Sequence, residues 1–284
     1  MRRTFLAAMV CLGCQPQLPP VPPRPKPQQP TPVTPPRPRP ATGPSIVELA
    51  SHGSHTCSRL DSEEVVCWGR NAYGQLGNRN RNDTSSPVKV AGVRDAKQLL
   101  TGRDFSCALR ANGSVVCWGN NEDGQLGDGR GAKVSARSLR PVAVSRVRAA
   151  SQISGGDWHA CALDRAGAVW CWGNGENGQI GSDASRAFSV PKKIEQLGPV
   201  RQIASGAKHV CALQRDGRVK CWGRNSEGQL GDGKAGSRIK PVFVSGITGA
   251  TNLWSGHNFS CAALGDKSVR CWGSNANGAL GYGG

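Results

Sequence analysis

Residues 221–231 read CWGRNSEGQLG, and this stretch recurs in five similar copies along the chain. Each copy begins with Cys-Trp-Gly, and successive copies are separated by 50, 54, 50 and 50 residues. The copies begin at Cys67, Cys117, Cys171, Cys221 and Cys271. Self-similarity at a period of about 20–50 residues is typical of solenoids and propellers. We therefore expect a fold of repeated units that pack on one another.

A second cysteine precedes every Cys-Trp-Gly by ten residues. In the second copy, residues 107–117 read CALRANGSVVC, two short apolar stretches around a turn. Gly113 suits the left-handed position of a three-residue hairpin loop. Counting outward from Asn112 places Cys107 opposite Cys117, and opposed residues of an antiparallel pair lie within disulfide range. We predict five such disulfides: Cys57–Cys67, Cys107–Cys117, Cys161–Cys171, Cys211–Cys221 and Cys261–Cys271.

The chain has twelve cysteines, and the two that remain lie near its start. Signal cleavage would remove Cys11, and acylation would cap Cys14. No cysteine is then left over, which is typical of proteins from oxidising compartments.

Each unit is predicted to hold about four short strands. An apolar stretch precedes each hairpin, for example at residues 96–100, 150–153, 200–204 and 250–254. A Pro-Val-x-Val pattern follows the glycine loop at 87–90, 141–144 and 241–244, with a looser version at 190–194. Four strands form a propeller blade. The predicted fold class is all-β, a propeller of about five four-stranded blades.

Three histidines invite a metal interpretation. His55, His159 and His209 stand two residues before the first cysteine of their copies, whereas Phe105 and Phe259 occupy that position in the other two. Structural zinc sites need four ligands at close spacing. A packing position for an aromatic or imidazole ring explains all five copies, so we expect neither a metal nor another cofactor.

Residues 206–231 resemble the regulator of chromosome condensation repeat family, with its Gly-x-x-His-x-Cys-Ala-Leu and Trp-Gly-x-Asn-x-x-Gly-Gln-Leu-Gly patterns. The resemblance covers about residues 46–284 and implies a β-propeller. It implies that Trp222 and Leu230 lie in the core and that Gly223 and Gly231 form tight turns. The family's usual propeller has seven blades. We expect a five-bladed ring that closes with residues 43–50 completing the last blade, because the ends of an open array would expose sheet edges. An open array and a truncated chain are the alternatives.

The chain is predicted to have three parts: residues 1–14, 15–44 and 45–284. Residues 1–14, MRRTFLAAMVCLGC, have a basic start and an apolar stretch too short to span a membrane, as in a secretory signal. Leu12-Gly13-Cys14 resembles a bacterial lipobox with lipidation at Cys14; ordinary cleavage is the alternative. Residues 15–44 are rich in proline and predict an extended stalk. We therefore expect export, either as an outer-membrane lipoprotein or to the cell exterior.

The chain carries 36 Lys and Arg against 19 Asp and Glu, which favours anionic partners. The basic excess is concentrated in the divergent loops 78–86, 128–140, 182–189 and 232–240, where propellers place specificity. We therefore expect a non-catalytic binding module for a protein or an anionic polymer, without a nucleic-acid partner and as a monomer. The candidate binding residues are Arg79, Arg81, Arg130, Lys133, Arg137, Arg140, Arg186, Lys234, Arg238 and Lys240.

The sequence lacks common catalytic motifs such as Gly-x-Ser-x-Gly and His-Glu-x-x-His. His52 and His257 are expected at the surface, and Asp128, Asp183 and Asp232 are expected to stabilise turns. A structural envelope protein without a specific ligand is the alternative function. A cryptic hydrolase, or a nucleotide exchange factor by family analogy, is less favoured.

Overall fold

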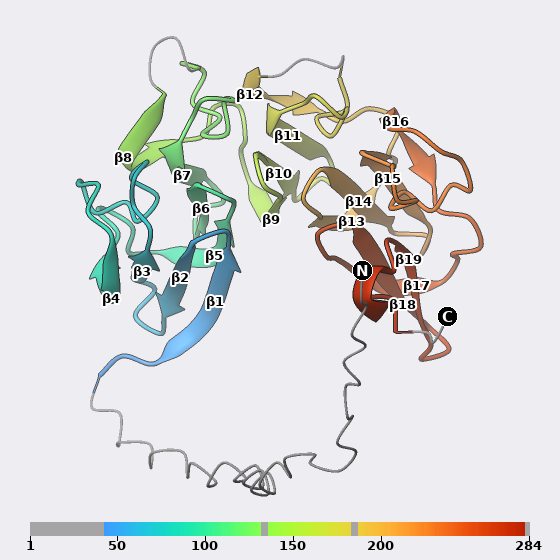
Figure 1. Cartoon of the computed structure of the whole chain (residues 1–284), viewed down its shortest axis with the longest axis horizontal. Helices are drawn as coiled ribbons and strands as arrows, with labels where there is room; N and C mark the ends of the chain where they lie inside the picture. Colours follow the sequence, from blue (N-terminus) through green and yellow to red (C-terminus); the bar gives the residue numbers. More distant parts are fainter. Residues whose placement is uncertain (1–42, 132–135, 183–186, 282–284) are drawn as a thin grey trace, which may run out of the picture. The chain divides into compact units, whose positions relative to one another are not determined.

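The computed structural model describes residues 43–131, 136–182 and 187–281, and over these ranges its regular secondary structure consists of β-strands and one short 3-10 helix, η1 (Ala276–Gly278) (Figure 1). Its strands form five antiparallel sheets in chain order, here called blades 1 to 5, which confirms the predicted fold class. Blade 1 contains β1 (Ile46–His52), β2 (His55–Leu60), β3 (Val65–Gly69) and β4 (Thr84–Lys89), and blade 2 contains β5 (Ala96–Thr101), β6 (Phe105–Arg110), β7 (Val115–Asn120) and β8 (Arg137–Ala143). Blade 3 contains β9 (Ala150–Gly155), β10 (His159–Asp164), β11 (Val169–Asn174) and β12 (Ala187–Lys193), and blade 4 contains β13 (Val200–Ser205), β14 (His209–Gln214), β15 (Val219–Gly223) and β16 (Arg238–Phe243). Blade 5 contains three strands, β17 (Ala250–Ser255), β18 (Phe259–Leu264) and β19 (Val269–Gly273).

The second and third strands of each blade form the predicted hairpin. In blade 2 the Arg110 amide donates to the Ser114 carbonyl, and Gly113 has a φ of +79°. This turn places Cys107 opposite Cys117 with 4.0 Å between their Cα atoms. All five predicted pairs are disulfides in the structure, one within each blade.

Neighbouring blades are joined by the loop that follows Cys-Trp-Gly. The indole nitrogens of Trp118, Trp172 and Trp222 each donate to the carbonyl of the loop glutamine in the preceding blade, at 2.8 to 2.9 Å. These three indoles are completely buried, as is Leu230 of the last complete loop. The core thus lies between blades, which confirms the structural role predicted for Trp222 and Leu230.

The first strands of blades 2, 3 and 4 add a second contact between blades. The Gln152 side chain donates to the carbonyl of Ile203 and accepts from its amide, at 3.0 and 2.9 Å. Gln98 does the same with Ile153, and Gln202 with Leu253. One amide side chain therefore satisfies both backbone groups of a residue in the next blade.

Residues 43–50 do not complete the last blade, so the closed ring considered above is wrong in that form. They contribute to β1, which pairs with β2 in blade 1. The reason is where each repeat begins: the first strand of every blade is the one that precedes the hairpin of the same blade. The two end blades each leave one face uncovered within the described ranges. Leu49 and Trp254 are 62% and 52% exposed, whereas Leu99 at the position of Leu49 is buried.

Residues 1–42, which include the predicted signal, Cys14 and most of the predicted stalk, lie outside the described residues. Within the described ranges, the structure contains no helix of the length and apolar character needed to cross a membrane.

Candidate anion-binding site

The predicted basic segments cover the connections between the third and fourth strands and the start of the fourth strands. Arg137 and Arg140, predicted in a loop, therefore lie on β8, and Arg238 and Lys240 lie on β16. The first two segments approach each other at the boundary between blades 1 and 2, because the Arg79 amide donates to the carbonyl of Leu139 in β8 at 2.9 Å. This bond places Arg79 next to Arg140, the neighbour of Leu139. The loop of blade 2 adds Arg130. The structure therefore brings together three of the predicted binding residues.

These three arginines and Arg110 line a pocket of about 360 Å³, here called the arginine pocket. Ligand pockets commonly span about 300–1,000 Å³. Its remaining walls are formed by small and apolar residues, namely Ala91, Gly92, Val93, Val116, Pro141 and Val142. The four arginines are thus the charged residues of the lining.

Two carboxylates just outside the lining hold two of the arginines. Arg110 Nε donates to Asp95 Oδ1 at 2.8 Å, and Arg130 Nε lies 3.9 Å from Asp128 Oδ2. Within the described residues, the side chains of Arg79 and Arg140 have no hydrogen-bond or ion-pair partner. Taken together, the four arginines and two aspartates leave two positive charges at the pocket.

Arg110 was missed by the sequence analysis because it lies in a hairpin strand and not in a variable loop. The sequence nevertheless contains a feature that points to Arg110. The same repeat position holds Leu60, Asp164, Gln214 and Leu264 in the other copies, so the arginine departs from the pattern. At the boundary between blades 2 and 3, Asp164 instead accepts a hydrogen bond from the Trp170 indole at 3.1 Å.

The other predicted residues lie apart from this pocket. Arg238 bonds its own loop, with its Nε 3.2 Å from Asp232 Oδ2. Arg137, on β8, and Arg81, Lys234 and Lys240 are exposed. Lys133 and Arg186 lie outside the described residues.

Asp128 and Asp232 stabilise turns as predicted, because each accepts a hydrogen bond from the backbone amide two residues ahead. Asp183 is not among the described residues.

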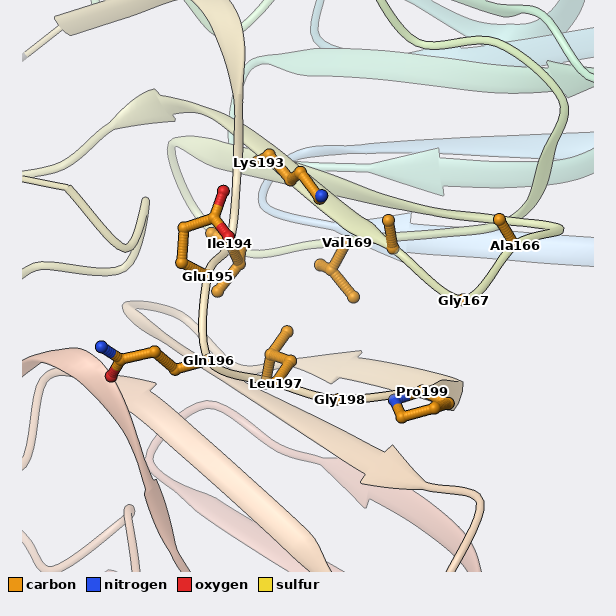
Figure 2. A pocket seen from close by; sticks show the side chains of 11 residues that line it. Ala166, Gly167, Val169, Lys193, Ile194, Glu195, Gln196, Leu197, Gly198 and Pro199 are labelled. Carbon is orange, nitrogen blue, oxygen red and sulfur yellow. The ribbon is translucent and has the colours of Figure 1, made fainter.

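A further pocket, of about 320 Å³, lies between the turn at 166–169 and the segment 193–199 (Figure 2). Its charged residues are Lys193 and Glu195. A pocket of about 220 Å³ occupies the corresponding place in blade 1, around Val65 and Val90. Because the hollow recurs with the repeat, we attribute it to the blade architecture and not to a specialised site.

The repeated His or Phe position is a packing slot, as predicted. In blades 2 to 5 the ring lies against a glycine three residues earlier, whereas blade 1 has His52 at that position. A Cβ added at Gly102, for example, would come within 2.0 Å of Phe105 Cε1. His55 Nε2 hydrogen-bonds Ser106 Oγ of the next blade at 2.7 Å, and His209 Nε2 bonds Ser260 Oγ at 2.8 Å.

The slot histidines are neutral near pH 7. Burial lowers the pKa of His55 and of His159 to about 4, and that of His209 to about 3. The neighbouring cysteines form disulfides, and the described residues include no group of three side chains suited to hold a metal ion.

His52 and His257, which were expected at the surface, flank one carboxylate. His52 Nε2 lies 2.7 Å from Asp157 Oδ1 and His257 Nε2 lies 3.8 Å from Asp157 Oδ2. Burial alone would raise the pKa of Asp157, but the hydrogen bond and charge of His52, with the charges of His257 and Arg103, lower it overall. No serine or cysteine in the described part of the chain hydrogen-bonds either histidine, so a nucleophile–base pair is not formed there.

The arrangement of blades and loops is similar to that of known proteins. The ultraviolet-B receptor UVR8 of Arabidopsis thaliana is 29% identical over 153 residues, which are 53% of this chain and 34% of the receptor. Human WBSCR16 superposes with a TM-score of 0.75 at 24% identity, covering 84% of this chain and 64% of that one. Yeast RCC1 (Prp20), in a structure bound to Kap60, gives 0.74 at 24% identity, covering 85% and 59%.

The match therefore spans about a third of the plant receptor and less than two thirds of each solved chain. The family model for the RCC1-like domain matches residues 12–284, nearly the whole sequence, which confirms the resemblance inferred from the repeats. The chain belongs to the RCC1-like domain family.

Proposed function

We propose that this chain is a non-catalytic binding module that holds an acidic partner protein through the basic loops between the third and fourth strands of its blades. The observation that carries the proposal is the convergence of Arg79, Arg130 and Arg140 at one blade boundary. Arginine is suited to carboxylate and phosphate groups because its planar fork donates two parallel hydrogen bonds. Complementary charge also speeds association and selects partners.

A protein partner is favoured over a polymer by the relatives. Yeast RCC1, whose fold is similar, was solved with Kap60 bound, so a protein with this fold has a protein partner. For this chain, we further propose a setting outside the reducing cytoplasm, with Cys14 as the lipid attachment point. The five disulfides of the structure support an oxidising setting.

The test compares three purified forms of the chain as baits in envelope extract of the source cells. The parent is compared with the double variant Arg79→Glu, Arg140→Glu. The matched control is Arg148→Glu, Arg215→Glu, which makes the same change in net charge at two exposed arginines outside the arginine pocket. Captured proteins are quantified by mass spectrometry, and retention of each bait on heparin is measured in parallel.

We expect the parent and the control to capture the same acidic proteins, and the double variant to bind them at least about tenfold more weakly, since lost charge contacts cost well over 1.4 kcal/mol. Equal capture by all three baits would show that these loops are not the binding surface. Strong retention on heparin without any recovered protein would replace the protein partner by an anionic polymer.

A further inference from the structure

We propose that the arginine pocket between blades 1 and 2 binds a single tetrahedral oxyanion, a phosphate or sulfate group carried by the partner. This inference rests on the proposed function and specifies the chemical group that the surface recognises. It is carried by four observations. Four arginines line one pocket, and the side chains of Arg79 and Arg140 have no partner among the described residues. Arg79 has a positive φ, and the next blade boundary lacks the equivalent arginines.

The charge at the pocket matches a dianion. Asp95 and Asp128 neutralise two of the four arginines and orient Arg110 and Arg130. Arg79 and Arg140 keep their donors available, because no described side chain accepts from them. A phosphate monoester or a sulfate offers several oxygens in different directions, and each guanidinium can bind two of them. A carboxylate has one charge and two oxygens, so it would satisfy only part of this set.

Arg79 holds a backbone conformation that favours glycine. Its φ is +72°. The corresponding residues, two positions after the last glycine of the loop motif, are Gly129 in blade 2 and Gly233 in blade 4, with φ of +83° and +71°. A non-glycine residue in this region is strained because its Cβ approaches the backbone. The sequence has glycine at this position in three copies and Asp183 in one, so the fold does not require an arginine here, and we assign the Arg79 side chain a role in binding.

The same loop contact occurs at the next boundary without the arginines. The Gly129 amide donates to the Ser189 carbonyl of β12 at 2.9 Å, as the Arg79 amide does to Leu139. At that boundary, however, Gly129 replaces Arg79, Asp164 replaces Arg110 and Val190 replaces Arg140. The loop-to-strand contact therefore belongs to the fold, whereas the arginine pocket is particular to blades 1 and 2.

The test measures binding of inorganic phosphate and sulfate to the full chain by calorimetry, with acetate and chloride at equal ionic strength as controls. The variants are Arg79→Gly, which removes the guanidinium and suits the backbone, and Arg140→Gln. Arg148→Gln, outside the pocket, serves as the matched control. The unfolding temperature of each form is recorded without and with the anions.

We expect the parent and Arg148→Gln to bind phosphate and sulfate at least tenfold more tightly than acetate, and Arg79→Gly and Arg140→Gln to lose at least tenfold in affinity. Arg79→Gly should unfold at the same or a higher temperature than the parent without anion, so that its loss of binding is not a loss of folding. A phosphoserine peptide and a sulfated oligosaccharide, titrated in turn, identify which source of the oxyanion binds more tightly.

Equal affinity for acetate and phosphate, or unchanged phosphate affinity in Arg79→Gly, would overturn the oxyanion assignment. The partner-capture experiment separates this failure from failure of the proposed function. If the charge-reversed loops lose the partner while phosphate neither binds nor competes with it, the binding surface stands and the oxyanion inference fails. If neither the partner nor phosphate is bound, both fail.

Discussion

His159 offers a direct test of the physics of the packing slot. It is fully buried, and neither ring nitrogen has a hydrogen-bond partner among the described residues. The reason lies in the next blade, where Val210 occupies the position that Ser106 and Ser260 hold opposite His55 and His209. We predict that His159→Phe makes the protein more resistant to acid without loss of stability at pH 7, because Phe105 already fills the same slot.

The size of the effect follows from linkage. Burial lowers the pKa of His159 from its ordinary 6.5 to about 4. Between these values the unfolded chain binds a proton that the folded chain does not, so the free energy of unfolding is complete above pH 6.5 and falls as the pH drops toward 4. At pH 5, 1.36 kcal/mol per pH unit gives a loss of about 2 kcal/mol for this one residue.

Urea unfolding at pH 7 and pH 5, with the disulfides intact, measures the difference. His159→Phe should reduce the acid-induced loss of unfolding free energy by about 2 kcal/mol. The matched control His209→Phe should also reduce it, but should lose about 1 kcal/mol at pH 7 because the bond to Ser260 Oγ is removed. If His159→Phe keeps the full acid-induced loss of the parent, a neutral, buried imidazole at this position is refuted.

Two further predictions concern the repeat itself. Replacing Cys107 and Cys117 by alanine removes a crosslink across a short hairpin, and the free energy of unfolding should fall by about 3 kcal/mol. Peptide mapping without reduction should show each pair within its own blade; free thiols at these positions would contradict the hairpin register. Gln152→Ala should cost about 2 kcal/mol, because two hydrogen bonds to Ile203 are lost. Asn252→Ala, at the equivalent position in the last blade, should change the unfolding free energy by less than about 0.5 kcal/mol, and a similar cost in both variants would argue against the amide contact between blades.

Much of the fold is predictable because one sequence unit recurs five times along the chain. The ten-residue cysteine spacing and Gly113 determine the hairpin register, and the observed pairing of Cys107 with Cys117 follows from them. The sequence is less informative about the point in the repeat at which a blade begins. A repeat can be divided at any point, so the sequence alone left residues 43–50 free to pair with either end, and only the pairing of β1 with β2 decides it.

The candidate site was predictable in part. Loop composition singled out Arg79, Arg130 and Arg140, but it equally singled out Arg238, whose side chain is held by Asp232. Composition cannot distinguish an available guanidinium from one that stabilises its own loop. Arg110 was outside the prediction because it lies on strand β6 and not in a variable loop, and its place beside Arg79 of blade 1 depends on how the two blades pack.

The uncovered face of blade 5 has a consequence for thiol–disulfide chemistry. Cys261 and Cys271 are only half-buried, whereas the eight cysteines of the first four blades are 0–1% exposed. Exchange with a reductant requires access of the attacking thiolate to a sulfur atom. The last crosslink is therefore the one that a mildly reducing environment opens first, so that the redox sensitivity of the described repeats is concentrated at one end.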